Sequence, residues 1–198
     1  MRRELHVRFR EGGGVRFPSA TRLVVLVQQW SDQLSEFIES KLEAWMGLEI
    51  NRDKTRIVDL KEPGASLDFL GYTFRYDRDL HGRKKRYLNM FPSKKALQRE
   101  RDKPYEMTDK TQCSKPIPRL VEELNTHLKG WANYFSIGYP TDAYYQIDQH
   151  VRRRLIGHLR RRSQRPFRLP EGVSWEQYFR RLKLVKLALK TAQLPVRA

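Results

Sequence analysis

The stretch RLVEELNTHLKGWANYF, residues 119–135, decides how the second half of the chain folds. Its large apolar side chains are three or four positions apart, which is the spacing of one stripe along an α-helix. A stripe of this length predicts a helix that faces a core rather than a strand. The residues of the stripe are Leu120, Leu124, Leu128, Trp131 and Phe135.

The segments on both sides of this stretch are also predicted to be helical. Residues 94–103 are rich in charged helix formers, and we expect Pro104 to end that helix because proline cannot donate a backbone hydrogen bond. Residues 142–162 carry Ile147, Val151, Leu155 and Leu159 at intervals of four, and residues 175–190 form a last amphipathic segment. The predicted helix N-caps are Ser93, Thr141 and Ser174, the last with Gln177 in capping-box spacing.

Strand patterns occur only in the first 91 residues. The apolar run LVVLV, residues 23–27, is typical of a strand that is buried on both faces. A β-rich run follows at residues 55–60. Residues 68–76 and 86–91 predict a hairpin with its loop at His81 and Gly82.

One helix is expected among these strands. Ser31 can cap its N-terminus and Gly47 can close it. Its apolar stripe is Leu34, Phe37, Ile38, Leu42, Trp45 and Met46. The sequence therefore predicts an α+β chain, with a strand-helix-strand-hairpin unit over residues 1–91 and an all-α domain over residues 92–198.

The charge of the chain indicates a polyanionic partner. Forty Lys and Arg side chains stand against 23 Asp and Glu, so the net charge is +17 and the isoelectric point is near 10.2. Nucleic acid is the commonest polyanion, although an acidic membrane surface or a merely soluble basic protein would also fit. Most of the excess lies in residues 151–198, where Glu171 and Glu176 are the only acidic side chains.

No sequence feature indicates a membrane segment, a metal or a cofactor. No run reaches the roughly 18 apolar residues of a membrane span, and the start MRRELHVRF is not a signal peptide, so we expect a cytoplasmic protein. Cys113 is the single cysteine and the five histidines lack ligand spacing. Gly12, Gly13 and Gly14 are not followed by the GK[ST] of a phosphate loop.

The run VRRRLIGHLRRR, residues 151–162, is the strongest candidate for nucleic-acid binding. On a helix, two arginine clusters about two turns apart lie away from the apolar edge, a spacing that suits phosphates of a strand or the walls of a groove. The alternative is a solvated cationic face. We expect replacement of the arginines of either cluster to leave the fold intact. The candidate residues are Arg152, Arg153, Arg154, Arg160, Arg161 and Arg162, with Lys129, and with Tyr139, Tyr144 and Tyr145 to stack on bases.

Four segments make the chain resemble the group II intron reverse transcriptases, also called maturases. They are GLEINRDKTRIVDL (47–60), DFLGYTF (68–74), VEELNTHLKGWANYF (121–135) and DQHVRRRLIGHLRRR (148–162). The resemblance implies a palm-like remnant followed by the maturase-specific X domain, which serves as the polymerase thumb. It also implies a partner, structured RNA or an RNA–DNA hybrid, and a primer-grip-like role for Phe69, Leu70 and Gly71.

One departure from the family concerns catalysis. In the family, Tyr-Ala-Asp-Asp precedes the strand that corresponds to residues 23–27, and its carboxylates hold the catalytic Mg²⁺ ions. Here Phe17, Pro18, Ser19 and Ala20 occupy that place, and they cannot set two cations about 4 Å apart. We also expect the fingers and the other metal-binding aspartate to lie upstream of Met1 and to be absent.

The resulting hypothesis is a non-catalytic RNA-binding protein, without metal or cofactor. The alternative is one subunit of a split reverse transcriptase whose partner supplies fingers, palm and metals, and a decayed gene fragment is a third possibility. An unpaired strand edge at residues 23–27 would favour a protein partner or self-association, unless an N-terminal segment, residues 5–9, covers it.

Overall fold

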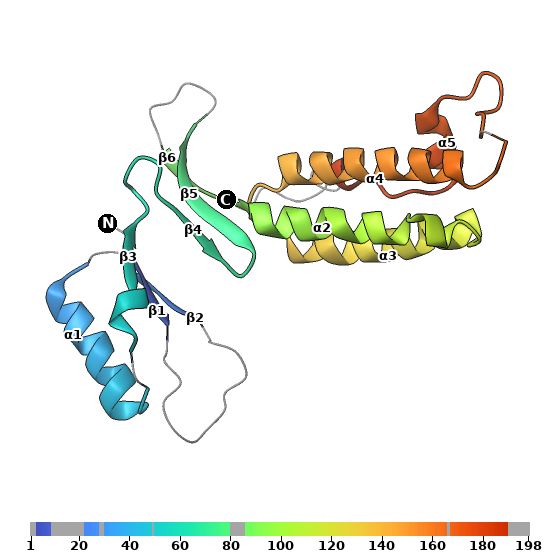
Figure 1. Ribbon diagram of the computed structural model, residues 1–198. Helices are drawn as coiled ribbons and strands as arrows, with labels where there is room; N and C mark the ends of the chain where they lie inside the picture. The colour runs from blue at the N-terminus through green and yellow to red at the C-terminus, as the bar shows by residue number, and fades with distance from the viewer. Residues whose placement is uncertain are drawn as a thin grey trace. The chain divides into compact units, whose positions relative to one another are not determined.

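The computed structural model describes residues 3–8, 22–27, 30–48, 50–79, 86–165 and 167–189. The chain divides into two compact units. The N-terminal unit comprises Met1–Leu67 and Phe74–Asn89, and the helical unit comprises Asp68–Thr73 and Met90–Ala198. Strands gather in the first part of the chain and long helices in the second (Figure 1), which confirms the predicted α+β class. The domain boundary predicted at residue 91 stays a prediction.

A small antiparallel sheet forms the start of the N-terminal unit. It has the order β2-β1-β3, with β1 (Arg3–Arg8) between β2 (Arg22–Val27) and β3 (Arg56–Asp59). Leu5 of β1 lies opposite Val25 on one side and Ile57 on the other. The expectation that residues 23–27 form a doubly buried strand is therefore wrong: β1 takes the central position, and Val24, Val25 and Val27 of β2 are only partly buried.

The predicted helix of this unit forms, but its apolar stripe is interrupted. Ser31 caps α1 (Asp32–Ser40) by accepting a hydrogen bond from the Leu34 amide at 3.2 Å. The helix continues as a π-helical turn (Lys41–Trp45), and Gly47 follows with a φ of 63°. A π-turn shifts the following side chains around the helix axis. Leu42 packs against Ile50 in a small core, whereas Phe37, Trp45 and Met46 are exposed.

A second sheet has three strands where the sequence predicted two. Its order is β4-β5-β6, with β4 (Ser66–Phe69), β5 (Tyr72–Arg78) and β6 (Arg86–Pro92). The unpredicted turn joins β4 to β5 through Leu70 and Gly71, whose φ angles are 49° and 82°. Two consecutive positive φ angles are typical of a type I′ hairpin. Leucine rarely adopts this conformation, which is why the pattern suggested one long strand.

The helical unit is built on α2 (Lys94–Met107), α3 (Ile117–Tyr134) and α4 (Thr141–Arg161). Short pieces complete it: α5 (Trp175–Arg181) and the 3₁₀ turns Lys110–Gln112 and Leu187–Leu189, while a further 3₁₀ turn, Arg52–Lys54, lies in the N-terminal unit. The predicted apolar stripes of α3 and α4 meet in the core of the helical unit, which confirms these two predicted helices. Fully buried apolar residues are Leu120, Leu124, Leu128, Ile147, Val151 and Leu155.

Helix ends follow the predicted caps only in part. Ser93 accepts a hydrogen bond from the Ala96 amide, and Ser174 forms the predicted capping box with Gln177. Thr141 is instead the first residue of α4, after an N-cap at Pro140. Pro104 does not end α2, which runs on to Met107 with the proline buried inside it.

The predicted last helix stops early, because polar side chains of α3 and α4 bind the backbone beyond it. After α5, Lys183 has a φ of 59°. Asn125 donates to the Lys183 carbonyl and accepts from the Val185 amide, each at 2.8 Å. The buried carboxylate of Asp148 accepts hydrogen bonds from the amides of Leu187 and Ala188 at 3.0 Å. These bonds hold residues 183–188 against the core in place of a helix.

Candidate nucleic-acid interface

One edge of α4 holds the C-terminal end of α2. The Thr108 carbonyl accepts hydrogen bonds from His158 Nδ1 at 3.2 Å and from Arg161 Nη2 at 3.0 Å. Arg154 Nε donates to the Thr108 hydroxyl at 3.2 Å, and its guanidinium lies 4.0 Å from the centre of the Tyr105 ring. Cationic donors are favourable at a helix C-terminus, where carbonyls lack helical partners.

These contacts correct one expectation about the arginine clusters. Arg154 and Arg161 contribute to the packing of α2 on α4, so their replacement would not leave the fold untouched. Arg152 is partly buried, with Glu176 at 3.9 Å. Arg162 is half-buried, and its Nη1 has no partner among the described residues.

The remaining two arginines, Arg153 and Arg160, lie on a different face of α4, about 100° around the helix from Arg154 and Arg161. Tyr145, Gln149, Arg153 and Arg160 fall within one sector of the helix, because their spacings are multiples of about one turn. We call these four residues the outer stripe. It extends about 22 Å along the helix axis at 1.5 Å per residue. Arg153, Arg160 and Arg161 are exposed, but Arg161 donates to the Thr108 carbonyl, so Arg153 and Arg160 are the members of the clusters best placed to meet a phosphate backbone.

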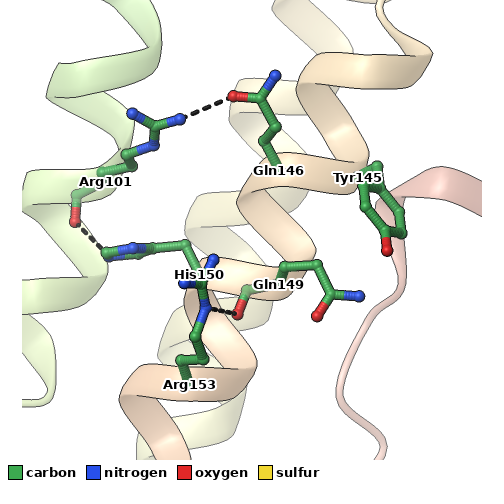
Figure 2. Close-up of a pocket in the computed structure, with 6 residues that line it drawn as sticks. All are labelled: Arg101, Tyr145, Gln146, Gln149, His150 and Arg153. Atoms are coloured by element: carbon green, nitrogen blue, oxygen red, sulfur yellow. Dashed lines mark hydrogen bonds between the residues drawn. The ribbon is translucent and has the colours of Figure 1, made fainter.

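A shallow pocket of about 330 Å³ lies beside the outer stripe, between α2 and α4. Figure 2 shows its lining: Arg101 from α2, and Tyr145, Gln146, Gln149, His150 and Arg153 from α4. Arg101 Nη2 donates to Gln146 Oε1 at 2.7 Å. His150 Nε2 lies 3.1 Å from the Arg101 carbonyl and must donate to it, since a carbonyl oxygen only accepts.

The pocket has a positive environment. Burial lowers the pKa of His150, and the neighbouring guanidinium groups of Arg154, Arg101 and Arg153 lower it further, against the opposing effect of its bond to Arg101. The six lining residues include no carboxylate. Sequence reasoning missed Arg101, Gln146, Gln149 and His150. Gln149 follows Tyr145 by four residues and His150 follows Gln146 by four, which is helical spacing, but Arg101 reaches the pocket from another helix and gave no signal.

The three candidate tyrosines have different environments. Tyr139 and Tyr145 are 61% and 59% exposed. Tyr144 is fully buried and donates hydrogen bonds to the carbonyls of Ala132, at 2.6 Å, and Phe135, at 3.1 Å. Burial raises its pKa to about 12. Tyr144 is therefore a core residue, and the expectation that it stacks on bases is wrong. Lys129 is exposed on α3.

The FLG turn and the GWANYF segment meet within the helical unit. Tyr134 donates a hydrogen bond to the Leu70 carbonyl at 2.9 Å, and the Tyr72 hydroxyl donates to the Tyr134 carbonyl. The Phe135 ring packs against Tyr72 with ring centroids 4.9 Å apart. Leu70 is left 67% exposed at the tip of the turn, and Phe69 is half-buried. Two motifs about 60 residues apart thus form one surface.

Residues 97–169 match the family model of the group II intron, maturase-specific domain. This match confirms the resemblance predicted from the sequence, because it identifies a part similar to the C-terminal region of a group II intron maturase. The matched segment contains the outer stripe and the whole pocket lining. No curated protein matches the chain.

The part of the chain that the structure describes holds no group of three or more His, Cys, Asp or Glu side chains arranged to bind a metal ion. None of its helices is long and apolar enough to cross a membrane. Residues 17–20, which we expect to correspond to the catalytic carboxylates of the family, lie outside the described residues.

Proposed function

We propose that this protein binds structured RNA through the outer stripe of α4, without catalysing nucleotide transfer. The observation that carries the proposal is the stripe itself: two exposed arginines and an exposed tyrosine on one face, within a segment that matches the maturase-specific domain. Phosphate contacts from arginine supply most sequence-independent affinity, and tyrosine can stack on unpaired bases.

The division of the arginine clusters makes the proposal specific. Arg154 and Arg161 already donate to α2, so their hydrogen-bonding capacity is partly used. Arg153 and Arg160 lie about 10 Å apart along the helix, seven residues at 1.5 Å each. That separation allows both guanidinium groups to contact phosphates of one RNA helix at the same time.

The test compares two double variants that lose the same charge. Arg153→Ala with Arg160→Ala removes two cations from the stripe, whereas Arg56→Ala with Lys61→Ala removes two exposed cations from the N-terminal unit. We expect the stripe variant to reduce the salt dependence of binding to an RNA hairpin by about two phosphate contacts. The control should retain the slope of the parent. Equal losses in both variants would contradict the proposal, because net charge alone would then explain the binding.

The non-catalytic part of the proposal rests on chemistry rather than on geometry. Phe17, Pro18, Ser19 and Ala20 offer no carboxylate for a two-metal site. The purified chain should therefore extend no primed template with Mg²⁺ or Mn²⁺. Incorporation of nucleotides that EDTA abolishes would show that other carboxylates perform the reaction.

A second candidate function, a subunit of a split reverse transcriptase, is favoured by the position of β2. Among the described strands, β2 lies at the edge of its sheet, and an edge strand can pair with a strand of another chain. Affinity purification from the native host, followed by identification of co-purified proteins, tests this candidate. A polymerase palm recovered in stoichiometric amount would support it, whereas recovery of the protein with RNA alone would favour the first proposal.

A further inference from the structure

The pocket beside the outer stripe combines one exposed aromatic ring, two carboxamides, an imidazole and two guanidinium groups around about 330 Å³. We propose that this pocket holds a single unpaired nucleotide of a bound RNA. The inference rests on the proposed RNA-binding function and names the structural feature of the RNA that the site selects.

Size and access favour one nucleotide over a continuous duplex. A volume of 330 Å³ lies near the lower end of small-ligand sites, which span about 300–1,000 Å³. Bases inside an RNA helix are stacked and paired, so their faces cannot reach a side chain. An unpaired base in a bulge or loop can swing out, and such bases are the usual targets of aromatic side chains in RNA recognition.

Tyr145 supplies the stacking surface. Its ring borders the pocket in Figure 2 and remains 59% exposed. Every base has a π-face, so stacking requires no particular sequence. The ring belongs to α4, a helix of 21 residues, and a helix fixes the position of a side chain better than a loop would.

The two glutamines can read the edge of the base. Gln146 Oε1 accepts a hydrogen bond from Arg101, which orients the amide so that its N–H groups serve as donors. Gln149 offers both a carboxamide donor and an acceptor next to Tyr145. Carbonyl oxygens and ring nitrogens of bases accept hydrogen bonds from such donors.

The charges place the phosphate. Arg101 and Arg153 stand at the pocket with guanidinium groups, each of which has five N–H donors and cannot be exhausted by a single bond. The low pKa of His150 keeps its ring neutral near pH 7, so the ring adds no competing charge. From a phosphate bound by Arg153, the RNA backbone would continue toward Arg160 along the outer stripe.

The experiment uses the full chain and two RNA hairpins that differ by one bulged 2-aminopurine in the stem. The parent should bind the bulged hairpin about tenfold more tightly than the fully paired one, since one stacked base is worth about that factor. Binding should also quench the 2-aminopurine fluorescence. Tyr145→Ala should reduce the affinity ratio to about one, and Tyr145→Phe should restore it, because phenylalanine retains the ring.

Two control variants separate the pocket from its surroundings. Arg160→Ala should lower the affinity for both hairpins equally and leave their ratio unchanged. Tyr139→Ala removes a similarly exposed tyrosine outside the pocket, so any loss of affinity should be the same for both hairpins and the ratio should stay unchanged. Thermal unfolding of each variant checks that the fold is intact.

Failure of the pocket and failure of RNA binding give different results. If the parent binds neither hairpin, both proposals are overturned. If the parent binds both hairpins equally, or if Tyr145→Ala keeps the preference, RNA binding stands and the pocket assignment is wrong. Adenosine monophosphate provides the last arm: competition at micromolar concentration would identify a site for free nucleotides and overturn the assignment to RNA.

Discussion

At the scale of single residues, neighbouring arginines on α4 lie in different environments. Arg153 is exposed on the outer stripe and donates to the Gln149 carbonyl of its own helix at 3.3 Å, whereas Arg154 contacts Thr108 and the ring of Tyr105 at the end of α2. The two positions are about 100° apart around the helix, so one residue of offset separates the proposed binding face from a packing face. The sequence analysis treated all six arginines alike, because a local pattern does not show which helix covers which face.

This division predicts that two adjacent substitutions affect different properties, the stability of the fold in one case and RNA binding in the other. Arg154→Ala should lower the free energy of unfolding by about 1–2 kcal/mol, since a cation–π contact and hydrogen bonds to α2 are lost. Arg153→Ala should change it by less than about 0.5 kcal/mol but weaken RNA binding. Urea denaturation and a binding titration measure the two effects. Equal stability of both variants would contradict the structural role of Arg154.

His158 gives the fold a defined response to acid. The side chain is fully buried, and burial lowers its pKa below the ordinary value of 6.5, helped by Arg162, Arg161 and Arg154 and opposed by its bond to Thr108. The native state therefore binds fewer protons than the unfolded chain once the pH falls below about 6.5. Stability is full above that pH and decreases as the pH falls toward the lowered pKa of the folded state.

His158→Gln tests this response, because glutamine can donate to the Thr108 carbonyl but does not titrate. The variant should be less stable than the parent at pH 7.5, yet its free energy of unfolding should change less between pH 7.5 and pH 5.5. Chemical denaturation at several pH values measures the difference. Parallel curves for the two proteins would show that His158 does not contribute. His150, whose pKa is lowered too, accounts for a remaining slope of the same sign.

At the scale of elements, the connections between helices and strands depend on backbone positions that tolerate little change. Gly138 has a φ of 86°, and an added Cβ would lie 2.2 Å from the Met90 carbonyl oxygen. The same carbonyl accepts a hydrogen bond from the Tyr139 amide at 2.8 Å. The link between β6 and the segment before α4 therefore requires glycine, both for its φ angle and for the close approach.

Gly138→Ala should destabilise the protein by about 3 kcal/mol or more, because strain and a steric clash add. Gly130→Ala is the matched control. Gly130 lies within α3, and an added Cβ there meets nothing within 4 Å. Alanine is the better helix former, so this change should stabilise the protein by up to about 1 kcal/mol. Thermal unfolding ranks the three proteins, and destabilisation of similar size at both positions would refute the argument.

At the scale of the whole molecule, the excess of positive charge should govern association with RNA. The chain carries +17, mostly in its C-terminal quarter, so binding releases the counterions of several phosphates. Not every cation contributes, since Arg154 and Arg161 are engaged with α2.

The parent protein should therefore bind structured RNA with a log–log salt slope of about −4.5 to −7, which corresponds to about five to eight phosphates. Fluorescence anisotropy between 50 and 300 mM salt gives the slope. A slope near zero would exclude a phosphate-dominated interface and contradict the proposed function.

The sequence by itself determined the fold class, the stripes of α3 and α4, several helix caps and the family resemblance. These features follow from local spacing, because helix periodicity and capping involve residues only a few positions apart. Contacts between distant segments decided the rest: the hydrogen bonds from α4 to α2, the burial of Tyr144, the passage of α2 through Pro104 and the arrival of Arg101 at the pocket. No local pattern encodes which faces meet, so only the tertiary structure separated the arginines of the outer stripe from those that contact α2.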